Sequence, residues 1–191
     1  MPGMKKIKVT RELNENTYLH AIAINQIEQA KKEQDGQRFR WIVPAMAFSV
    51  FRVEAICNVF GSQLFSHWSH FESTSFVGKV TMISESLGLT VDFSVEPWQT
   101  INKMKDFRNT LAHAKPQKVT KIYEVSENHP EHLLIPDGKK TILSFSNIET
   151  ASRFEQVATD LEMIWLNNAR AMNKVVEVHG SVVRERIEDQ S

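Results

Sequence analysis

The sequence predicts a mainly α protein with a single domain, and three observations carry this prediction. Apolar residues recur at three- and four-residue steps over long blocks, proline and glycine separate the blocks, and only two short stretches alternate like β-strands. At 191 residues with 41% apolar side chains, the chain can bury one substantial core. We therefore expect one domain over 1–191, with an N-terminal helical extension at 1–40, a helical core at 41–178 and a charged, flexible tail at 179–191.

Five blocks have helical periodicity. The first, at about 13–33, is amphipathic and lies in the N-terminal extension. The second begins at Pro44, because proline suits a first helical turn, and runs to Gly61. It is apolar nearly all round, so we expect it to be central. The remaining three helices are expected at 76–87, from Pro97 to before Pro116, and from Ile148 to about Val178.

The stretch between the last two helices changes to a two-residue period. K-V-T-K-I-Y-E-V and T-I-L-S-F-S alternate on either side of the turn residues I-P-D-G. This pattern predicts a small β-hairpin at about 118–147. Residues 63–75, in contrast, have no clean period, and we expect them to be mostly irregular.

Charge and cysteine content limit the class of protein. Lys plus Arg and Asp plus Glu number 23 each, so no global positive field indicates a nucleic-acid partner, and any RNA contact must be local. Cys57 is the single cysteine, which excludes a disulfide framework. The N-terminus lacks the apolar stretch of a signal peptide, and the apolar runs are too short to span a bilayer. We expect a soluble cytoplasmic protein without membrane contact, metal or cofactor.

The segment F-R-N-T-L-A-H-A-K-P, from Phe107 to Pro116, carries the chemistry of the predicted fourth helix. Arg108 falls inside the apolar arc of this helix, where an unpaired guanidinium would be costly, so something anionic must meet it. Asn109 and His113 share one ridge, whereas Arg108 and His113 would lie about 140° apart on an ideal helix. One straight helix therefore cannot aim both side chains at one atom. Unwinding of the last turn, or a twofold dimer, would bring them together, and the dimer is the simpler solution.

Arg108 and His113 also have purely structural interpretations. Glu54 falls in the apolar arc of the second helix, so an intramolecular ion pair with Glu54 could explain Arg108. This pair is compatible with a functional role if Glu54 holds Arg108 ready for phosphate. His113 could simply cap the helix end by bonding a terminal carbonyl.

The segment resembles the R-x4-6-H signature of HEPN-domain ribonucleases. Arg108, Asn109 and His113 match it with four intervening residues, and R-N-x-x-A-H-x-x-P is similar to the way many HEPN proteins end this helix. The stretch E-A-I-C-N, from Glu54 to Asn58, also resembles the early core helix of that family. The resemblance covers roughly Pro44 to Pro116 and the closing helix.

This resemblance implies an up-and-down four-helix bundle, here with the extra N-terminal helix and the small hairpin, that forms a homodimer and cuts RNA without metal. It implies attack of a ribose 2′-hydroxyl on the neighbouring phosphate, with Arg108 stabilising the phosphate and His113 as acid or base. Asn109 would orient His113 or a phosphate oxygen. Glu54 and Asn58 would support the site, and Lys105, Lys115 and Lys118 would bind RNA. A toxin or antiviral-defence role, with an antitoxin or other protein partner, is common in the family. The alternative is a non-catalytic HEPN-like dimeric module that binds a protein or nucleotide.

Other candidate sites are weaker. His67, His70 and Glu72 are close enough in sequence to suggest a metal site, but no second ligand pair follows. The aromatics Phe65, Trp68 and Phe71 could stack on RNA bases, although core or dimer packing is the more common use. The flanking lysines Lys103 and Lys121 extend the basic cluster, for which a solvated surface is the alternative interpretation. The sequence contains neither a Gly-rich phosphate loop nor a C-x-x-C motif.

Overall fold

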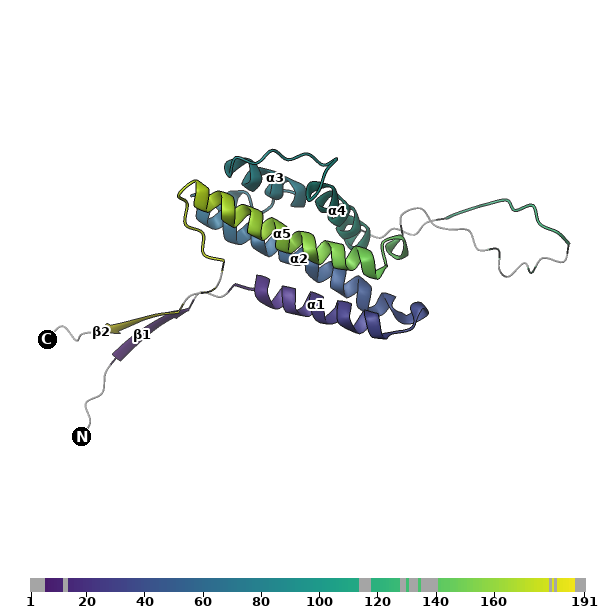
Figure 1. Cartoon of the computed structure of the whole chain (residues 1–191), viewed down its shortest axis with the longest axis horizontal. Helices are drawn as coiled ribbons and strands as arrows, with labels where there is room; N and C mark the ends of the chain where they lie inside the picture. The colour runs from purple at the N-terminus through teal and green to yellow at the C-terminus, as the bar shows by residue number, and fades with distance from the viewer. Residues whose placement is uncertain are drawn as a thin grey trace, which may run out of the picture.

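The computed structural model confirms the mainly α prediction and contains five α-helices in its described part (Figure 1). It describes residues 6–11, 14–113, 118–127, 130, 134, 141–178, 180 and 182–187. The helices pack side by side into one body, and two short strands extend away from it. The largest fully buried side chains form one core shared by the last four helices; they include Trp165, Phe60, Phe107, Phe154 and Met46.

Helix α1 (Asn16–Lys32) and helix α2 (Phe39–Leu64) form a helical hairpin. The prediction that the second helix begins at Pro44 is wrong, because Pro44 lies inside α2. The first turn forms ahead of the proline since Glu33, just after α1, holds it. The Glu33 carboxylate accepts from Arg40 Nη2 at 2.6 Å and from Trp41 Nε1 at 3.3 Å. These contacts offset the backbone hydrogen bond that the proline removes.

Helix α2 is central, as predicted, and contacts α1, α3, α4 and α5. The expectation that every apolar run is too short to span a bilayer is wrong for this helix. Its 26 residues are long and apolar enough by length and composition, with a mean hydropathy of 1.5 over an 18-residue window. Half of that window is buried inside the protein, however, which is what the core helix of a bundle requires.

The remaining helices close the core around α2. Helix α3 (Phe76–Ser86) is capped at its N-terminus by Ser75, whose hydroxyl accepts from the Gly78 backbone N–H. The helix ends before Gly88, which has a φ of +73°. Helix α4 (Trp98–Ala112) follows Pro97, as predicted. Helix α5 (Ile148–Ala171) is capped by the Asn147 side chain and ends about seven residues before the predicted Val178.

The predicted hairpin between the last two helices is wrong in the described residues. Residues 118–127 form no strand, and Ile142–Ser144, in the middle of the expected second strand, form a 3-10 turn. The aromatic residue that follows this turn is partly buried against the core. The Phe145 ring packs edge to face on Phe107, with a centroid separation of 5.8 Å. Packing on the helical core therefore overrides the local alternation.

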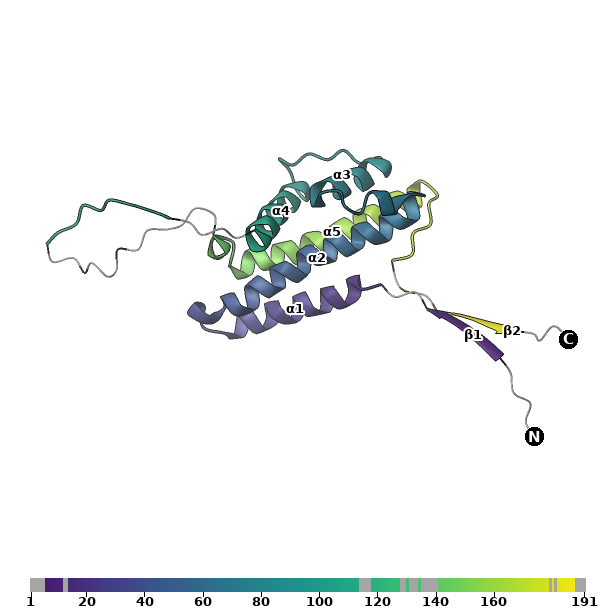
Figure 2. The same ribbon diagram turned by 180° about the vertical axis from the view of Figure 1, so that it is seen from behind.

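A strand pair that the sequence patterns did not predict joins the two ends of the described chain. Strand β1 (Lys6–Arg11) pairs antiparallel with strand β2 (Val182–Ile187), which lies within the segment expected to be a flexible tail. Lys6 is opposite Ile187 and Arg11 is opposite Val182. Figures 1 and 2, which view the molecule from opposite sides, both place this ribbon beyond one end of the helices.

Candidate functional site

The predicted site segment lies at the C-terminal end of α4 and is anchored there by Phe107. The Phe107 side chain is fully buried and packs edge to face on Phe145 and on Phe154, with the latter centroid 5.9 Å away. Three aromatic rings therefore fix the rotation of α4 about its own axis. The following residue, Arg108, is consequently held at a defined position on the surface of α4 next to α2.

Arg108 forms the ion pair that one of the two sequence interpretations predicts. Its Nε lies 3.0 Å from Glu54 Oε1 on α2, and the two side chains are 39% and 25% exposed. Within the described part of the chain, the Nη1 and Nη2 atoms of Arg108 have no hydrogen-bond partner. One edge of the guanidinium is thus held by α2, while its other donors remain available to an anion.

Asn109 and His113 are both exposed. Helix α4 ends at Ala112, and His113 is its C-cap residue, with φ −124°, ψ 31° and a backbone N–H that donates to Asn109 O at 3.0 Å. Because the backbone of His113 departs from helical geometry, its side chain need not lie 140° from that of Arg108, as it would on an ideal helix. The structure brings Arg108 and Glu54 together. Asn109 and His113, which follow Arg108 in the sequence, are exposed to solvent.

The supporting and basic residues have mixed placements. Asn58 is exposed, lies one turn after Glu54 on α2, and its Oδ1 is 3.4 Å from Lys79 Nζ of α3. Lys105 Nζ donates to Asn102 Oδ1 at 2.7 Å and lies 3.3 Å from Asp106 Oδ1, so its charge is partly matched on α4 itself. Lys118 is exposed, and Lys115 falls outside the described residues.

A buried ion network between α1, α2 and α5 was not predicted from the sequence. Arg52 of α2 is 5% exposed and binds two carboxylates of α5, Glu155 through Nη1 and Glu162 through Nη2 at 2.8 Å. Glu155 also accepts from Ser49 Oγ at 3.0 Å, and His20 Nδ1 of α1 lies 2.5 Å from its Oε1. The available signal was the seven-residue spacing of Glu155 and Glu162, which places both on one face of the last helix, at the edge of its apolar stripe.

A hollow of about 360 Å³ lies beside this network, between α1 and α5. His20, Glu155 and Thr159 line one part of it, and the apolar side chains of Ile24 and Ile27 line another. The Glu155 carboxylate is already bound by Arg52, Ser49 and His20. These contacts join α1 to α2 and α5, so the polar cluster has a structural role.

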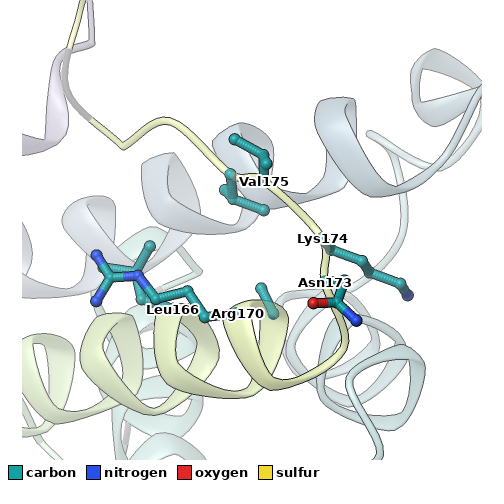
Figure 3. Close-up of a pocket in the computed structure, with 7 residues that line it drawn as sticks. Leu166, Arg170, Asn173, Lys174 and Val175 are labelled. Atoms are coloured by element: carbon teal, nitrogen blue, oxygen red, sulfur yellow. The ribbon is translucent and has the colours of Figure 1, made fainter.

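A second hollow, of about 460 Å³, lies between the end of α5 and the segment that follows it (Figure 3). Arg170 and Lys174 line it, but they extend in opposite directions. Lys174 Nζ is bound to Ser86 O at 3.1 Å. The two cations therefore do not converge on one point. Neither hollow is lined by Arg108, Asn109 or His113.

The weaker candidates of residues 63–75 mostly pack against one another. His67 and His70 stack at 5.7 Å, and the described residues contain no group of three or more His, Cys, Asp or Glu placed to hold a metal. Trp68 is 4% exposed and stacks on Phe65, so it serves the core, whereas Phe71 is 40% exposed. Gln63 and Leu64 still belong to α2, and the rest of this stretch is irregular apart from the 3-10 turn Trp68–His70, in agreement with the prediction that 63–75 is mostly irregular.

Comparison with known proteins found no matching family model, no similar curated protein and no similar solved structure. Function is therefore inferred from the residues of the site themselves.

Proposed function

We propose that this chain is a metal-independent endoribonuclease of the HEPN type, with Arg108, Asn109 and His113 as its catalytic residues. The observation that carries the proposal is the state of Arg108. Its Nε is held by Glu54 at 3.0 Å while both Nη groups stay free within the described residues. A guanidinium oriented in this way matches the fork geometry of a phosphate. An exposed histidine follows at the end of the same helix.

Each residue has a defined task in RNA cleavage. The ribose 2′-hydroxyl attacks the adjacent phosphorus, and the bond from phosphorus to the 5′-oxygen of the next nucleotide breaks. The products are a 2′,3′-cyclic phosphate and a 5′-hydroxyl. His113 moves a proton to or from these oxygens, and Arg108 stabilises the charge that develops on the phosphate. Asn109 orients His113 or a phosphate oxygen, and Lys105, Lys115 and Lys118 hold the RNA strand.

The proposed architecture is a HEPN-like up-and-down bundle of α2 to α5 that works as a homodimer. Phe51, Glu54 and Asn58 are spaced by three and four residues, so they share one face of α2. On that face Phe51 is 45% exposed and packs edge to face on Phe48, which supports an apolar contact with a second copy beside the Glu54–Arg108 pair. A twofold contact at this face would bring two α4 ends to one cleft. A cytoplasmic toxin or antiviral effector, with an antitoxin as protein partner, is the proposed context.

The same ion pair favours a second candidate, a non-catalytic HEPN-like dimeric module that binds a protein or nucleotide. In that case Glu54 and Arg108 would simply join α2 to α4. The two candidates differ in what happens when the charge of Arg108 is removed, since only the ribonuclease loses an activity.

RNA cleavage in EDTA distinguishes the candidates. Purified protein is incubated with mixed RNA, and the fragment ends are analysed for cyclic phosphate. We expect Arg108→Ala and His113→Ala to lower the cleavage rate by about 100- to 10,000-fold. The matched controls Arg153→Ala and His70→Ala remove an exposed arginine and an exposed histidine elsewhere, and they should cleave like the wild type. Equal cleavage by all five proteins, or no cleavage by the wild type, would refute the ribonuclease proposal.

A further inference from the structure

The β1–β2 ribbon is exposed on surfaces that proteins usually cover. Ile7, Val9 and Val182 are 45%, 58% and 46% exposed. Among the described elements, each strand of the ribbon has the other as its only strand partner. A two-stranded ribbon alone is marginally stable in water, and it gains independent stability from a third strand or a packing partner. The ribbon is therefore a candidate surface for binding another molecule.

The base of the ribbon is fixed to the helical body. The Asn14 side-chain amide donates to Val178 O, which joins the segment after β1 to the segment before β2. The Gln63 amide of α2 bonds both backbone groups of Glu177, with Nε2 3.0 Å from Glu177 O and Oε1 2.8 Å from Glu177 N. These bonds tie the segment before α1 to the segment after α5, and tie the segment after α5 to the end of α2. Figure 2 shows the ribbon beyond this end of the helices. The ribbon projects from a fixed base.

The ribbon concentrates positive charge, although the net formal charge of the whole chain is zero. Its twelve residues contain five cationic residues and one acidic residue, Glu185, for a formal charge of +4; the cationic ones are Lys6, Lys8, Arg11, Arg184 and Arg186. Because the whole chain is formally neutral, the remaining residues carry −4. Glu188 and Asp189 follow β2 in the sequence and lie outside the described residues.

The register gathers the arginine positions on one face. Arg11 pairs with Val182, Val9 with Arg184 and Ile7 with Arg186. Directly opposed residues in an antiparallel pair share a face, and so do alternate residues along a strand. The three arginine positions therefore alternate with Ile7, Val9 and Val182 on a single face of the ribbon.

We propose that this ribbon is a nucleic-acid-binding arm whose arginines and lysines contact the phosphodiester backbone. Charge complementarity selects this partner, because pairing with a second ribbon would oppose +4 to +4 and cost free energy. Six residues per strand give a length of about 20 Å, and a two-stranded ribbon of this width enters the major groove of a DNA duplex. The arm uses neither Arg108 nor His113, so this proposal and the ribonuclease proposal can fail separately.

Fluorescence anisotropy with the full chain tests the arm. The labelled probes are a two-turn duplex DNA, the matching duplex RNA and a single-stranded RNA, each titrated at about 50 mM and about 200 mM salt. We compare the wild type with Arg184→Gln/Arg186→Gln and with Lys31→Gln/Lys32→Gln. The second variant loses the same charge from the last turn of α1.

The ribbon variant should bind at least about tenfold more weakly and reduce the magnitude of the slope of log K against log salt by about 2, while the α1 variant binds like the wild type. The probe that binds best identifies the kind of nucleic acid. Equal weakening by the ribbon and α1 variants would overturn the proposal. It would also be overturned if no probe binds.

Discussion

Replacement of Arg52 by methionine should destabilise the protein strongly, because Arg52 is the cation of the buried network. The substitution keeps an unbranched side chain of similar length but leaves the carboxylates of Glu155 and Glu162 without their cation. Both acids are buried, at 3% and 9% exposure, so water cannot replace the guanidinium. Breaking a buried ion pair by removing one partner costs about 3–5 kcal/mol. For a chain of this size, that loss corresponds to a fall in Tm of about 6–20 °C.

Urea unfolding followed by circular dichroism at 222 nm measures this cost. Arg153→Met is the matched control, because Arg153 pairs with Glu96 at 3.3 Å but both side chains are about 40% exposed. It should lose less than about 1 kcal/mol. A triple variant, Arg52→Met with Glu155→Gln and Glu162→Gln, removes all three charges and should be more stable than Arg52→Met alone. Unfolding of Arg52→Met and Arg153→Met at the same urea concentration would refute the stabilising role of the buried network.

Two further predictions concern the core. Burial raises the pKa of the Cys57 thiol, which disfavours the reactive thiolate, so native protein at pH 8 should react with a thiol reagent no faster than it opens; rapid labelling without denaturant would contradict this. Gly61→Ala should cost about 1–3 kcal/mol, because the new Cβ would lie 2.3 Å from the Trp68 ring, whereas Gly36→Ala meets nothing within 4 Å and is the control. Matched thermal melts compare the two glycine variants, and equal Tm values would rule out the close approach.

The helices could be predicted from the sequence because each depends on local pattern and punctuation. Pro97, Gly88 and the apolar stripe of the last helix mark elements that the structure contains. The errors arise where the local structure depends on contacts with residues distant in the sequence. Glu33 holds the turn ahead of Pro44, and Phe145 packs on Phe107 of the core where a strand was expected. The pairing of β1 with β2 joins residues more than 170 positions apart, which no local window detects.

Of the candidate site, the sequence predicted the helix that carries Arg108 and the ion pair of Arg108 with Glu54. The interpretation that Glu54 forms an ion pair with Arg108 is confirmed. It required only that two opposite charges in the apolar arcs of neighbouring helices pair with each other. Arg52 was missed because its partners lie on α5, more than 100 residues further along the chain. Knowing that α5 covers this side of α2 was necessary to pair them.

The two arginine ion-pair sites that involve α2 also explain why activity and stability can be tested separately. Arg52 and Glu54 are two residues apart, hence about 200° apart around the helix axis, so they face opposite sides of α2. Arg52 meets two buried carboxylates, whereas the Glu54–Arg108 pair is partly exposed and stabilises the fold by at most about 1 kcal/mol. Arg108→Ala should therefore remain folded with a Tm close to that of the wild type. A loss of RNA cleavage in that variant would then report on the chemistry of the guanidinium rather than on the integrity of the bundle.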